Sequence, residues 1–364
     1  MRIAFVLTQS EGGPVDVTLA VMLELASRGF EVALFAPRPA RGGAAIEPYL
    51  HEIDVSSKLS VRAMRRTRRR ILGFAPDIVH AQDRRSGLMC ARLGGPRAPL
   101  VVHTYHGVPD DVSMPWLTLG TPPRPSFYTH ATLAADAVVA RAVDHTVVVA
   151  DMMGTFLKQR LRVPAHKVSH IDNGLPLPPH TPPTGTNRLL FVGLLVRRKG
   201  VHMLLDALAA ALRDSPGLLL DVAGDGPERA ALQEQAQRLG LGEAVRFLGF
   251  RSDIPQLLAT HDALVLPSSM EQQPLVLIEA MAAGKLIVAT ATGGIVDMLR
   301  DLQDGIQVVA PGNTKELTGA LLALGTTKNV QAASKEISAA ARQRFSVSTC
   351  TDRHLELYSR LSRG

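Results

Sequence analysis

Short apolar runs rich in β-branched residues alternate with helix-like segments along most of this chain. In the first half the runs are IAFVL, EVALFAP, DIVHAQ, LVVHTYHG and HTVVVA. In the second half they are RLLFVGLL, LLLDVAGDG, AVRFLGF, DALVLPSS, LIVAT and IQVVA, with helices expected from about Val201 and Pro227. Repeated strand–helix units predict an α/β fold with doubly wound parallel sheets.

A proline-rich segment separates the two series. Residues 174–187 read GLPLPPHTPPTGTN, and five prolines in this stretch disfavour both helix and sheet. We therefore predict two Rossmann-like domains facing across a cleft, residues 1–175 and 188–345, joined by a linker at 176–187. Residues 346–364 are expected to form a C-terminal helix with Leu355, Tyr358 and Leu361 on one face.

The composition restricts the class of protein. The chain has 364 residues, 46% hydrophobic and 20% charged, as in a soluble globular protein. Its two cysteines, Cys90 and Cys350, argue against a disulfide scaffold or a structural zinc site. The first apolar run is too short for a signal peptide, and no 18-residue apolar run is present, so we expect a cytoplasmic protein.

The net charge of +7 favours an anionic partner, and much of the excess lies between Arg62 and Arg70, where six residues are arginine. On a helix, Val61, Met64, Ile71 and Leu72 would remain to anchor this segment. Three interpretations are open: a solvated helix, a docking face for anionic lipid at the inner face of the membrane, or a site for an anionic acceptor. Nucleic-acid binding is not indicated, because no aromatic residue lies among the arginines.

Two carboxylates bracket a predicted helix start in the second half. Glu271 follows the run ALVLPSS, Pro274 suits the first helical position, and Gly284 suits the residue after the helix. Glu271 therefore lies at the carboxyl end of a strand, where open α/β sheets bind ligands. Glu279 lies roughly 10 Å further along the helix, too far for one acid/base pair. The spacing suits the two ends of a nucleotide-sugar with a phosphate between them, although two solvent-exposed side chains would give the same pattern.

The glycine-rich loops allow more than one interpretation. GDGPER at 224–229 follows a strand and precedes a helix, but it lacks the third glycine of a dinucleotide fingerprint. Arg251 would suit a 2′-phosphate, so an NADP-dependent oxidoreductase remains an alternative. Gly12 and Gly13 after the first strand either allow a ligand to approach the backbone or simply form a tight turn.

Two histidines close the run LVVHTYHG. His103 and His106 have no visible third partner, so we expect no metal site. His106, beside Gly107 at the strand's carboxyl end, is interpreted as a hydrogen-bonding group facing the cleft. The alternative is a histidine with a structural role.

The segments FVGLLVRRKGVHMLLDAL, LLLDVAGDGPERAAL, VRFLGF, DALVLPSSMEQQPLVLIEAMAAGKLIVATATGG and DGIQVVAPGN follow one another in a specific order. HTYHG and HIDNGLP precede them. This ordered series resembles the family-4 retaining glycosyltransferases with the GT-B fold, most strongly from Arg188 to Gly312. The resemblance implies that the second domain binds a nucleotide-sugar, that the first takes the acceptor, and that the C-terminal helix returns to the first domain.

The resemblance also implies roles for individual residues. Lys199 would contact the diphosphate, and Leu275 and Val276 would offer backbone amides to it. Glu279 would bind the ribose, and Glu271 the transferred sugar.

Further roles follow from the same resemblance. The backbone of Phe250 and Arg251 would contact the base. Gly12 and Gly13 would face the diphosphate from the first domain. His106 would lie near the sugar or the acceptor, and with Glu271 and Lys199 it completes the expected catalytic set.

The chain departs from the family pattern at two places. Leu194 follows Gly193 where the family usually has arginine, so phosphate neutralisation would pass to Arg197 or Arg198. The family often reads EGFG where this chain has EQQP, in which Pro274 removes a backbone N–H. The amides of Gln272 and Gln273 would then read sugar hydroxyls.

We therefore expect a hexosyltransferase of bacterial-type glycoconjugate or natural-product biosynthesis. It would use a UDP- or GDP-sugar, retain the anomeric configuration and need no metal or other cofactor, with the acceptor left open. Alternatives are a GT-B sugar-nucleotide epimerase or phosphorylase, or a protein that binds a nucleotide-sugar without turnover.

Overall fold

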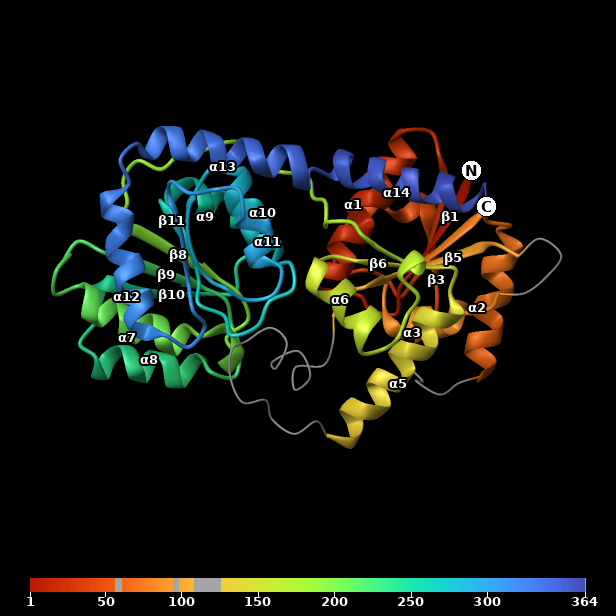
Figure 1. Ribbon diagram of the computed structural model, residues 1–364, viewed down its shortest axis with the longest axis horizontal. Helices are drawn as coiled ribbons and strands as arrows, with labels where there is room; N and C mark the ends of the chain where they lie inside the picture. The colour runs from red at the N-terminus through yellow and green to blue at the C-terminus, as the bar shows by residue number, and fades with distance from the viewer. Residues whose placement is uncertain (56–60, 94–97, 108–125, 364) are drawn as a thin grey trace. The chain divides into compact units, whose positions relative to one another are not determined.

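The computed structural model describes residues 1–55, 61–93, 98–107 and 126–363, in two compact units (Figure 1). Unit 1 takes the described residues up to Pro176 and from Phe345 onward, and unit 2 takes Leu177–Arg344. Each unit is a parallel sheet with helices packed against it. The α/β fold expected from the alternating pattern is confirmed.

Unit 1 contains a seven-stranded parallel sheet in the order β3-β2-β1-β4-β5-β6-β7. Four residues of β1 pair with both neighbouring strands, which places β1 in the buried interior of the sheet. The strands are β1 (Arg2–Val6), β2 (Glu31–Ala36), β3 (Leu50–Glu52), β4 (Ile78–Ala81), β5 (Leu100–Tyr105), β6 (His145–Val148) and β7 (Val168–His170).

Two groups of helices accompany this sheet. α1 packs against α14, whereas α3 packs against both α2 and α5. α1 starts directly after a glycine N-cap, with a proline in its first turn, and α3 starts with a capping box formed by Asp83 and Ser86. The helices are α1 (Gly13–Ser27), α2 (Val61–Gly73), α3 (Arg84–Cys90), α5 (Phe127–Ala142), α6 (Asp151–Gln159) and α14 (Val347–Leu361).

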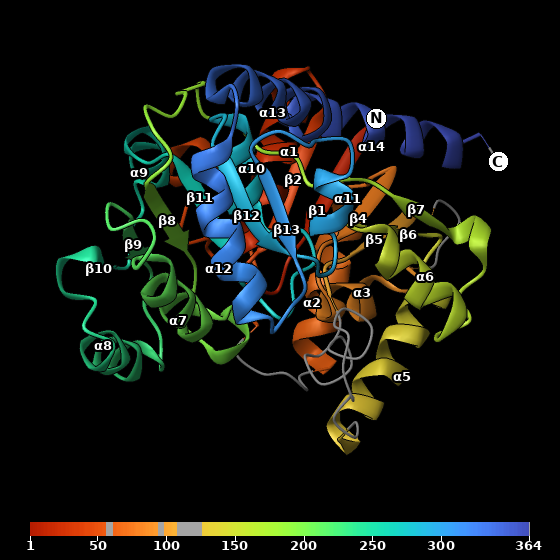
Figure 2. The same ribbon diagram turned by 60° about the vertical axis from the view of Figure 1, so that its left-hand side comes forward.

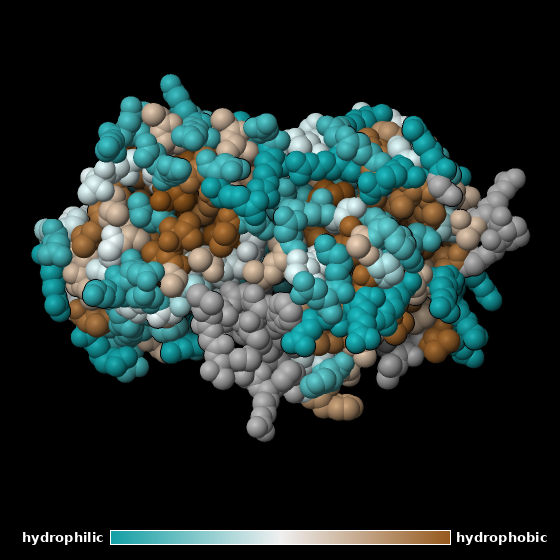
Figure 3. Space-filling model, viewed as in Figure 1, coloured by the Kyte–Doolittle hydropathy of each residue, from teal (hydrophilic) through white to brown (hydrophobic). Residues whose placement is uncertain are grey.

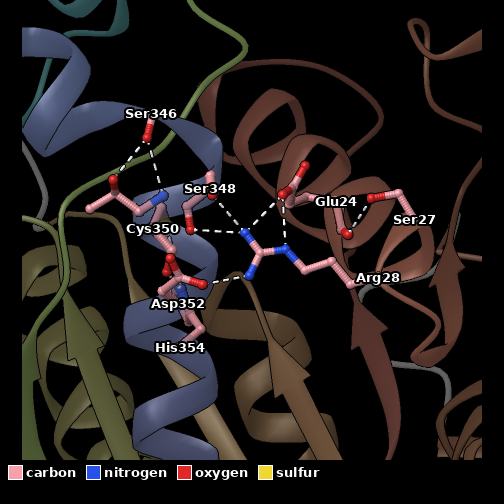
Figure 4. Close-up of polar contacts among 9 residues, drawn as sticks. Glu24, Ser27, Arg28, Ser346, Ser348, Cys350, Asp352 and His354 are labelled. Carbon is pink, nitrogen blue, oxygen red and sulfur yellow. Dashed lines mark hydrogen bonds and ion pairs between the residues drawn. The ribbon is translucent and has the colours of Figure 1, made fainter.

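The C-terminal helix α14 belongs to unit 1, as expected, and an arginine at the end of α1 holds it there (Figure 4). The Arg28 guanidinium donates to the Asp352 carboxylate at 2.5 Å and to the Ser348 hydroxyl at 2.8 Å. The predicted buried face is only partly right. Tyr358 is buried, but Leu355 and Leu361 are half-buried. The buried side chains of α14 are Cys350, Thr351, His354, Leu357 and Tyr358.

Fewer apolar side chains of helix α2 are buried than the sequence suggested. Ile71 is fully buried, but Val61 is 57% exposed, and Met64 and Leu72 are exposed as well. Thr67 is the other buried residue of the helix. The arginines leave only a narrow buried stripe, because five of the six are exposed around the helix, including Arg70, which donates to the carbonyl oxygen of Glu52 in β3.

Unit 2 contains a six-stranded parallel sheet in the order β10-β9-β8-β11-β12-β13, and Figure 2 shows β8, β11, β12 and β13 side by side. Its core is formed by the aliphatic side chains of these strands and of the helices beside them. Figure 3 shows hydrophilic side chains over much of both units, with an apolar patch on the visible face of unit 2. The strands are β8 (Arg188–Val192), β9 (Leu219–Ala223), β10 (Val245–Gly249), β11 (Ala263–Leu266), β12 (Leu286–Thr290) and β13 (Ile306–Val309).

Helices α7 to α11 connect successive strands of unit 2, as in other doubly wound sheets, and α12 and α13 follow the last strand. The long α13 precedes the terminal helix and ends at Phe345, next to the unit boundary. The helices are α7 (Val201–Ala211), α8 (Arg229–Arg238), α9 (Ile254–Thr260), α10 (Leu275–Ala282), α11 (Ile295–Leu299), α12 (Thr314–Ala323) and α13 (Val330–Phe345).

The proline-rich segment at 176–187 contains no helix or strand. It is nevertheless fixed to unit 2 by hydrogen bonds. Thr181 donates its N–H to the Ala283 carbonyl at 3.0 Å, and the Asp262 carboxylate accepts from the N–H groups of Gly185 and Arg188. The segment therefore follows the surface of unit 2 in one conformation.

Candidate functional site

Two of the predicted catalytic residues, Lys199 and Glu271, meet in unit 2. The Lys199 ammonium lies 2.5 Å from Glu271 Oε1, and the same oxygen accepts from the Ser268 hydroxyl at 2.8 Å. The side chains of Lys199 and Glu271 are only 16% and 7% exposed. The pair is thus a largely buried, charge-assisted contact, and the sequence did not predict it.

The pair forms because its two loops follow neighbouring strands. Lys199 ends the short 3-10 helix η4 (Arg197–Lys199) after β8, and Glu271 lies between β11 and α10. The N–H of Ser269 donates to the Arg198 carbonyl at 2.8 Å. Gly200 has φ +71°, and a Cβ there would lie 2.1 Å from the Pro267 carbonyl oxygen. The two loops are therefore joined at the carboxyl edge of the sheet, where α/β proteins bind ligands.

A third loop, which the sequence did not identify as part of the site, packs against the backbone of Glu271. It follows β12 and reads ATGG, and the N–H of Gly294 donates to the Gln272 carbonyl at 2.7 Å. Gly293 has φ +55°, and a Cβ there would lie 1.5 Å from the Glu271 carbonyl oxygen. A side chain at this position is incompatible with the observed loop. The sequence did contain an indication of this contact, because paired glycines at the end of a strand often mark a close approach of two backbone segments.

The glycines of GDGPER pack against the loop after β8. A Cβ at Gly224 would lie 1.9 Å from the Gly193 carbonyl oxygen, and one at Gly226 would lie 2.5 Å from that of Leu195. Arg251, considered as a 2′-phosphate ligand, donates instead to the Asp253 carboxylate, with Nε 2.7 Å from Oδ1. Close packing of the chain accounts for these glycines without a dinucleotide.

Helix α10 presents its N-terminus beside Glu271. Pro274 is the N-cap, one residue earlier than predicted, and no side chain of the described residues caps the helix. Leu275 and Val276 are half-buried in the first turn, where backbone N–H groups have no partner within the helix. Glu279 is half-buried one turn further on. This is the arrangement expected for a bound phosphate with a carboxylate beyond it.

Other predicted donor-site residues border the same loops. Gln272 is half-buried and Gln273 is buried. Phe250 is 71% exposed and directly follows β10, whose last residue, Gly249, accepts from the Gly224 N–H at 2.8 Å. The backbone of Phe250 and Arg251 thus follows the carboxyl end of β10, next to the loop after β9.

The remaining predicted residues lie in unit 1. Gly12, at φ +103°, is the N-cap of α1, and Gly13 is the first residue of that helix. The Gly12 carbonyl accepts from the N–H groups of Val15 and Asp16. A Cβ at Gly12 would meet only Pro14, at 3.9 Å, so the backbone angle rather than crowding favours glycine.

His106 is held at the end of β5. A ring nitrogen, Nε2, lies 3.2 Å from the Gln82 side-chain oxygen, which sits at the end of β4. Burial, and then the neighbouring His354, lower the pKa of His106 to about 4. Burial likewise lowers the pKa of His103 to about 3. His106 is therefore a neutral ring at physiological pH. Among the described residues, no three His, Cys, Asp or Glu side chains group in a way that would hold a metal ion.

Two family models cover nearly the whole chain. The model described as Glycosyltransferase Family 4 matches residues 11–177, and the one described as Glycosyl transferases group 1 matches residues 178–344. The chain belongs to glycosyltransferase family 4.

Named relatives agree with this membership. The chain is 28% identical over 279 residues to glycogen synthase of Mycobacterium tuberculosis, a match covering 75% of this chain and 65% of that protein. Two solved structures share its fold over nearly their whole length. They are Anabaena HepE in complex with UDP-glucose (TM-score 0.78, 21% identity, 99% of each chain) and sucrose-phosphate synthase of Thermosynechococcus elongatus (TM-score 0.80, 19% identity, 100% and 99%).

Leu194 lies at the position where the resemblance led us to expect arginine. Its side chain is 54% exposed, directly after Gly193 and before the loop that carries Lys199. Arg197 is exposed and Arg198 is half-buried in η4, so both guanidinium groups come from the same loop as Lys199. No helix among the described residues combines the length and apolarity needed to cross a bilayer.

Proposed function

We propose that this glycosyltransferase moves a hexose from a UDP- or GDP-sugar to an acceptor hydroxyl, with retention at the anomeric carbon and without a metal ion. The observation that carries the proposal is the Lys199–Glu271 pair beside the uncapped start of α10. One cation, one carboxylate and the N-terminal amides of a helix that no described side chain caps lie at the carboxyl edge of the sheet in unit 2. Membership of family 4 supports the same reaction class.

The pair suggests how the donor would bind. Glu271 forms an ion pair with Lys199 at 2.5 Å. A diphosphate at the start of α10 would offer the ammonium a second anion, and an ammonium has three N–H donors. Glu271 would then accept hydrogen bonds from sugar hydroxyls, and Glu279 from the ribose.

The same residues would stabilise the departing group. When the bond between the anomeric carbon and the diphosphate breaks, negative charge grows on the diphosphate while the acceptor oxygen bonds to that carbon. Lys199 and the amides of Leu275 and Val276 would stabilise this charge without a metal. This electrostatic stabilisation of the diphosphate increases toward the transition state. Lys199→Ala should therefore reduce turnover more than donor affinity.

Unit 1 would supply the acceptor side. His106 has its pKa lowered to about 4, so it would act as a neutral hydrogen-bonding group toward sugar or acceptor. The arginines of α2 would hold the protein at the inner face of a membrane with anionic lipids, each contributing about 1 kcal/mol at low salt.

Two residues favour a second function, nucleotide-sugar binding without turnover. Leu194 occupies a position where the family usually has arginine, and Pro274 at the start of α10 has no N–H to donate. Both features reduce stabilisation of a leaving diphosphate.

A thermal-shift screen of UDP-, GDP-, TDP- and ADP-sugars, followed by a donor-consumption assay, tests both functions. A ligand at 100 times its dissociation constant should stabilise the fold by about 2.7 kcal/mol. Stabilisation with turnover supports transfer, and stabilisation without turnover for any acceptor supports the second function. Neither function survives if no nucleotide-sugar stabilises the protein.

A further inference from the structure

An open groove in unit 1 separates helix α2 from the segment that follows β3. Arg62, Arg66 and Arg70 of α2 line one side, and residues 52–55 line the other. Its volume of about 960 Å³ is large enough for a small phosphorylated molecule or a lipid headgroup. The groove lies at the carboxyl end of β3, where α/β sheets commonly bind ligands.

The three arginines share the groove because of their spacing. Residues four apart on an α-helix are offset by only about 40° around its axis, so they lie on neighbouring turns of one face. The smaller Ala63 and Thr67 also line the groove, from between these turns.

Two of these arginines are available to a ligand. Arg62 and Arg66 are exposed, and neither has an ion pair or hydrogen bond within the described part of the chain. Arg70 is engaged, since its guanidinium donates to the Glu52 carbonyl oxygen at 2.6 Å. That bond fixes the opposite side of the groove to α2.

The charge balance of the groove favours an anion. The acidic residues in its lining are Glu52 and Asp54. The Glu52 carboxylate lies 3.6 Å from the guanidinium of Arg38, and Asp54 also has a partner. No acidic side chain among the described residues therefore neutralises the guanidinium groups of Arg62 and Arg66.

We propose that this groove binds a phosphate-bearing ligand through Arg62 and Arg66. A guanidinium donates two parallel hydrogen bonds to phosphate oxygens, and two arginines one turn apart can hold one phosphate or diphosphate group between them. The phosphate belongs to a soluble molecule or to a lipid headgroup. Its role as part of the acceptor rests on the transferase function proposed above, but the binding does not.

The other arginines of α2 provide a matched control. Arg65 and Arg69 are exposed on the same helix but do not line the groove. Arg68 is unsuitable, because it donates to the carbonyl oxygens of Met89 and Arg92. The double variants Arg62→Gln/Arg66→Gln and Arg65→Gln/Arg69→Gln therefore remove the same charge from the same helix, and only the first pair lines the groove.

The first experiment measures each arginine separately, by modification with phenylglyoxal and mass spectrometry, with and without inorganic pyrophosphate. We expect pyrophosphate to slow modification of Arg62 and Arg66 at least fivefold and to leave Arg65 and Arg69 unchanged. A uniform effect on all four, or no effect on any, overturns the proposal. The measurement needs no donor or turnover, so it is independent of the donor site in unit 2.

The second experiment distinguishes the two sources of phosphate, using cosedimentation with vesicles of phosphatidylglycerol and phosphatidylcholine. For a lipid headgroup, the groove variant should bind at least tenfold more weakly than the control variant. For a soluble ligand, the two variants should bind vesicles alike while pyrophosphate still protects Arg62 and Arg66. Equal loss of vesicle binding without such protection would show only a charged face, and the groove would not be a site.

Discussion

Replacing Lys199 by methionine should destabilise unit 2, because it leaves a buried carboxylate without its cation. Glu271 is 7% exposed, and the Ser268 hydroxyl would remain as its donor, at 2.8 Å. Removing one partner of a buried ion pair costs about 3–5 kcal/mol. Lys199 keeps 16% of its side chain exposed, so water reaches the site and we expect the lower end, about 3 kcal/mol.

Glu271→Gln should cost less. The amide oxygen of glutamine still accepts from Lys199 and Ser268, so only the charge is lost, at about 1 kcal/mol. Independent effects would sum to about 4 kcal/mol in the double variant Lys199→Met/Glu271→Gln. Because the double variant leaves no unpaired charge, we expect about 2 kcal/mol, a coupling of about 2 kcal/mol.

Urea unfolding followed by hydrogen-exchange mass spectrometry of β11 and α10 peptides would measure these values in unit 2 itself. A local readout is needed because a chain with two units need not unfold in a single step. The reasoning is refuted if Lys199→Met unfolds at the wild-type urea concentration, or if the double variant loses the full sum of the single variants.

Three further predictions concern other described residues. Gly293→Ala should weaken donor binding at least tenfold, because the added Cβ would displace Glu271. The control Gly312→Ala, at φ +80° with open space around it, should cost only about 1 kcal/mol of stability. Equal donor affinity in the two variants would count against the role of the loop that carries Gly293. Burial lowers the pKa of Lys285 to about 8, so the unfolded chain binds more protons between pH 8 and about 10.5. The unfolding free energy of the wild type should therefore rise over this window relative to Lys285→Met, and parallel pH profiles would contradict it. His106, with its pKa lowered to about 4, should show no protonation by NMR from pH 8 down to about 5, and a midpoint near 6.5 would contradict its burial.

The sequence was most informative where one residue type repeats over a whole element. The longer strands and the Gly and Pro boundaries of α10 follow from apolar runs and turn residues. The strand starts agree within one residue, but the predicted runs extend up to three residues past the strand ends. Strands β3 and β7 were missed because LHE and VSH are three residues long and partly polar. Their pairing with neighbouring strands, not their own propensity, makes them strands.

Amphipathic faces were predicted less well. On α14 the sequence suggested Leu355, Tyr358 and Leu361, but the buried face includes the polar residues Thr351 and His354. Hydrophobicity alone could not identify this face, because polar side chains can be buried with hydrogen-bond partners, as His354 is, with Nδ1 2.9 Å from the Cys350 carbonyl oxygen. Tyr358 illustrates this, since its hydroxyl lies 2.6 Å from Nδ1 of buried His80.

The donor site was predicted as separate residues rather than as an arrangement. Lys199 and Glu271 are 72 positions apart, and their contact depends on the adjacency of β8 and β11 in the sheet. Strand order is a long-range property that the spacing within either motif does not contain. Gly293 was missed for the same reason, because its role appears only when the loops after β11 and β12 are brought together.

Calorimetric titration of UDP and GDP into the wild type, Glu279→Ala and Glu271→Gln tests the central claim most directly, that unit 2 binds the donor with its nucleotide toward Glu279 and its sugar toward Glu271. We predict that one nucleotide binds the wild type and that Glu279→Ala loses roughly 1.5–3 kcal/mol, about 10- to 150-fold in affinity. Glu271→Gln should bind that nucleotide at least as tightly as the wild type, because the charge of Lys199 is then no longer offset by a carboxylate. The claim is contradicted if neither nucleotide binds, or if Glu271→Gln weakens the nucleotide as much as Glu279→Ala does.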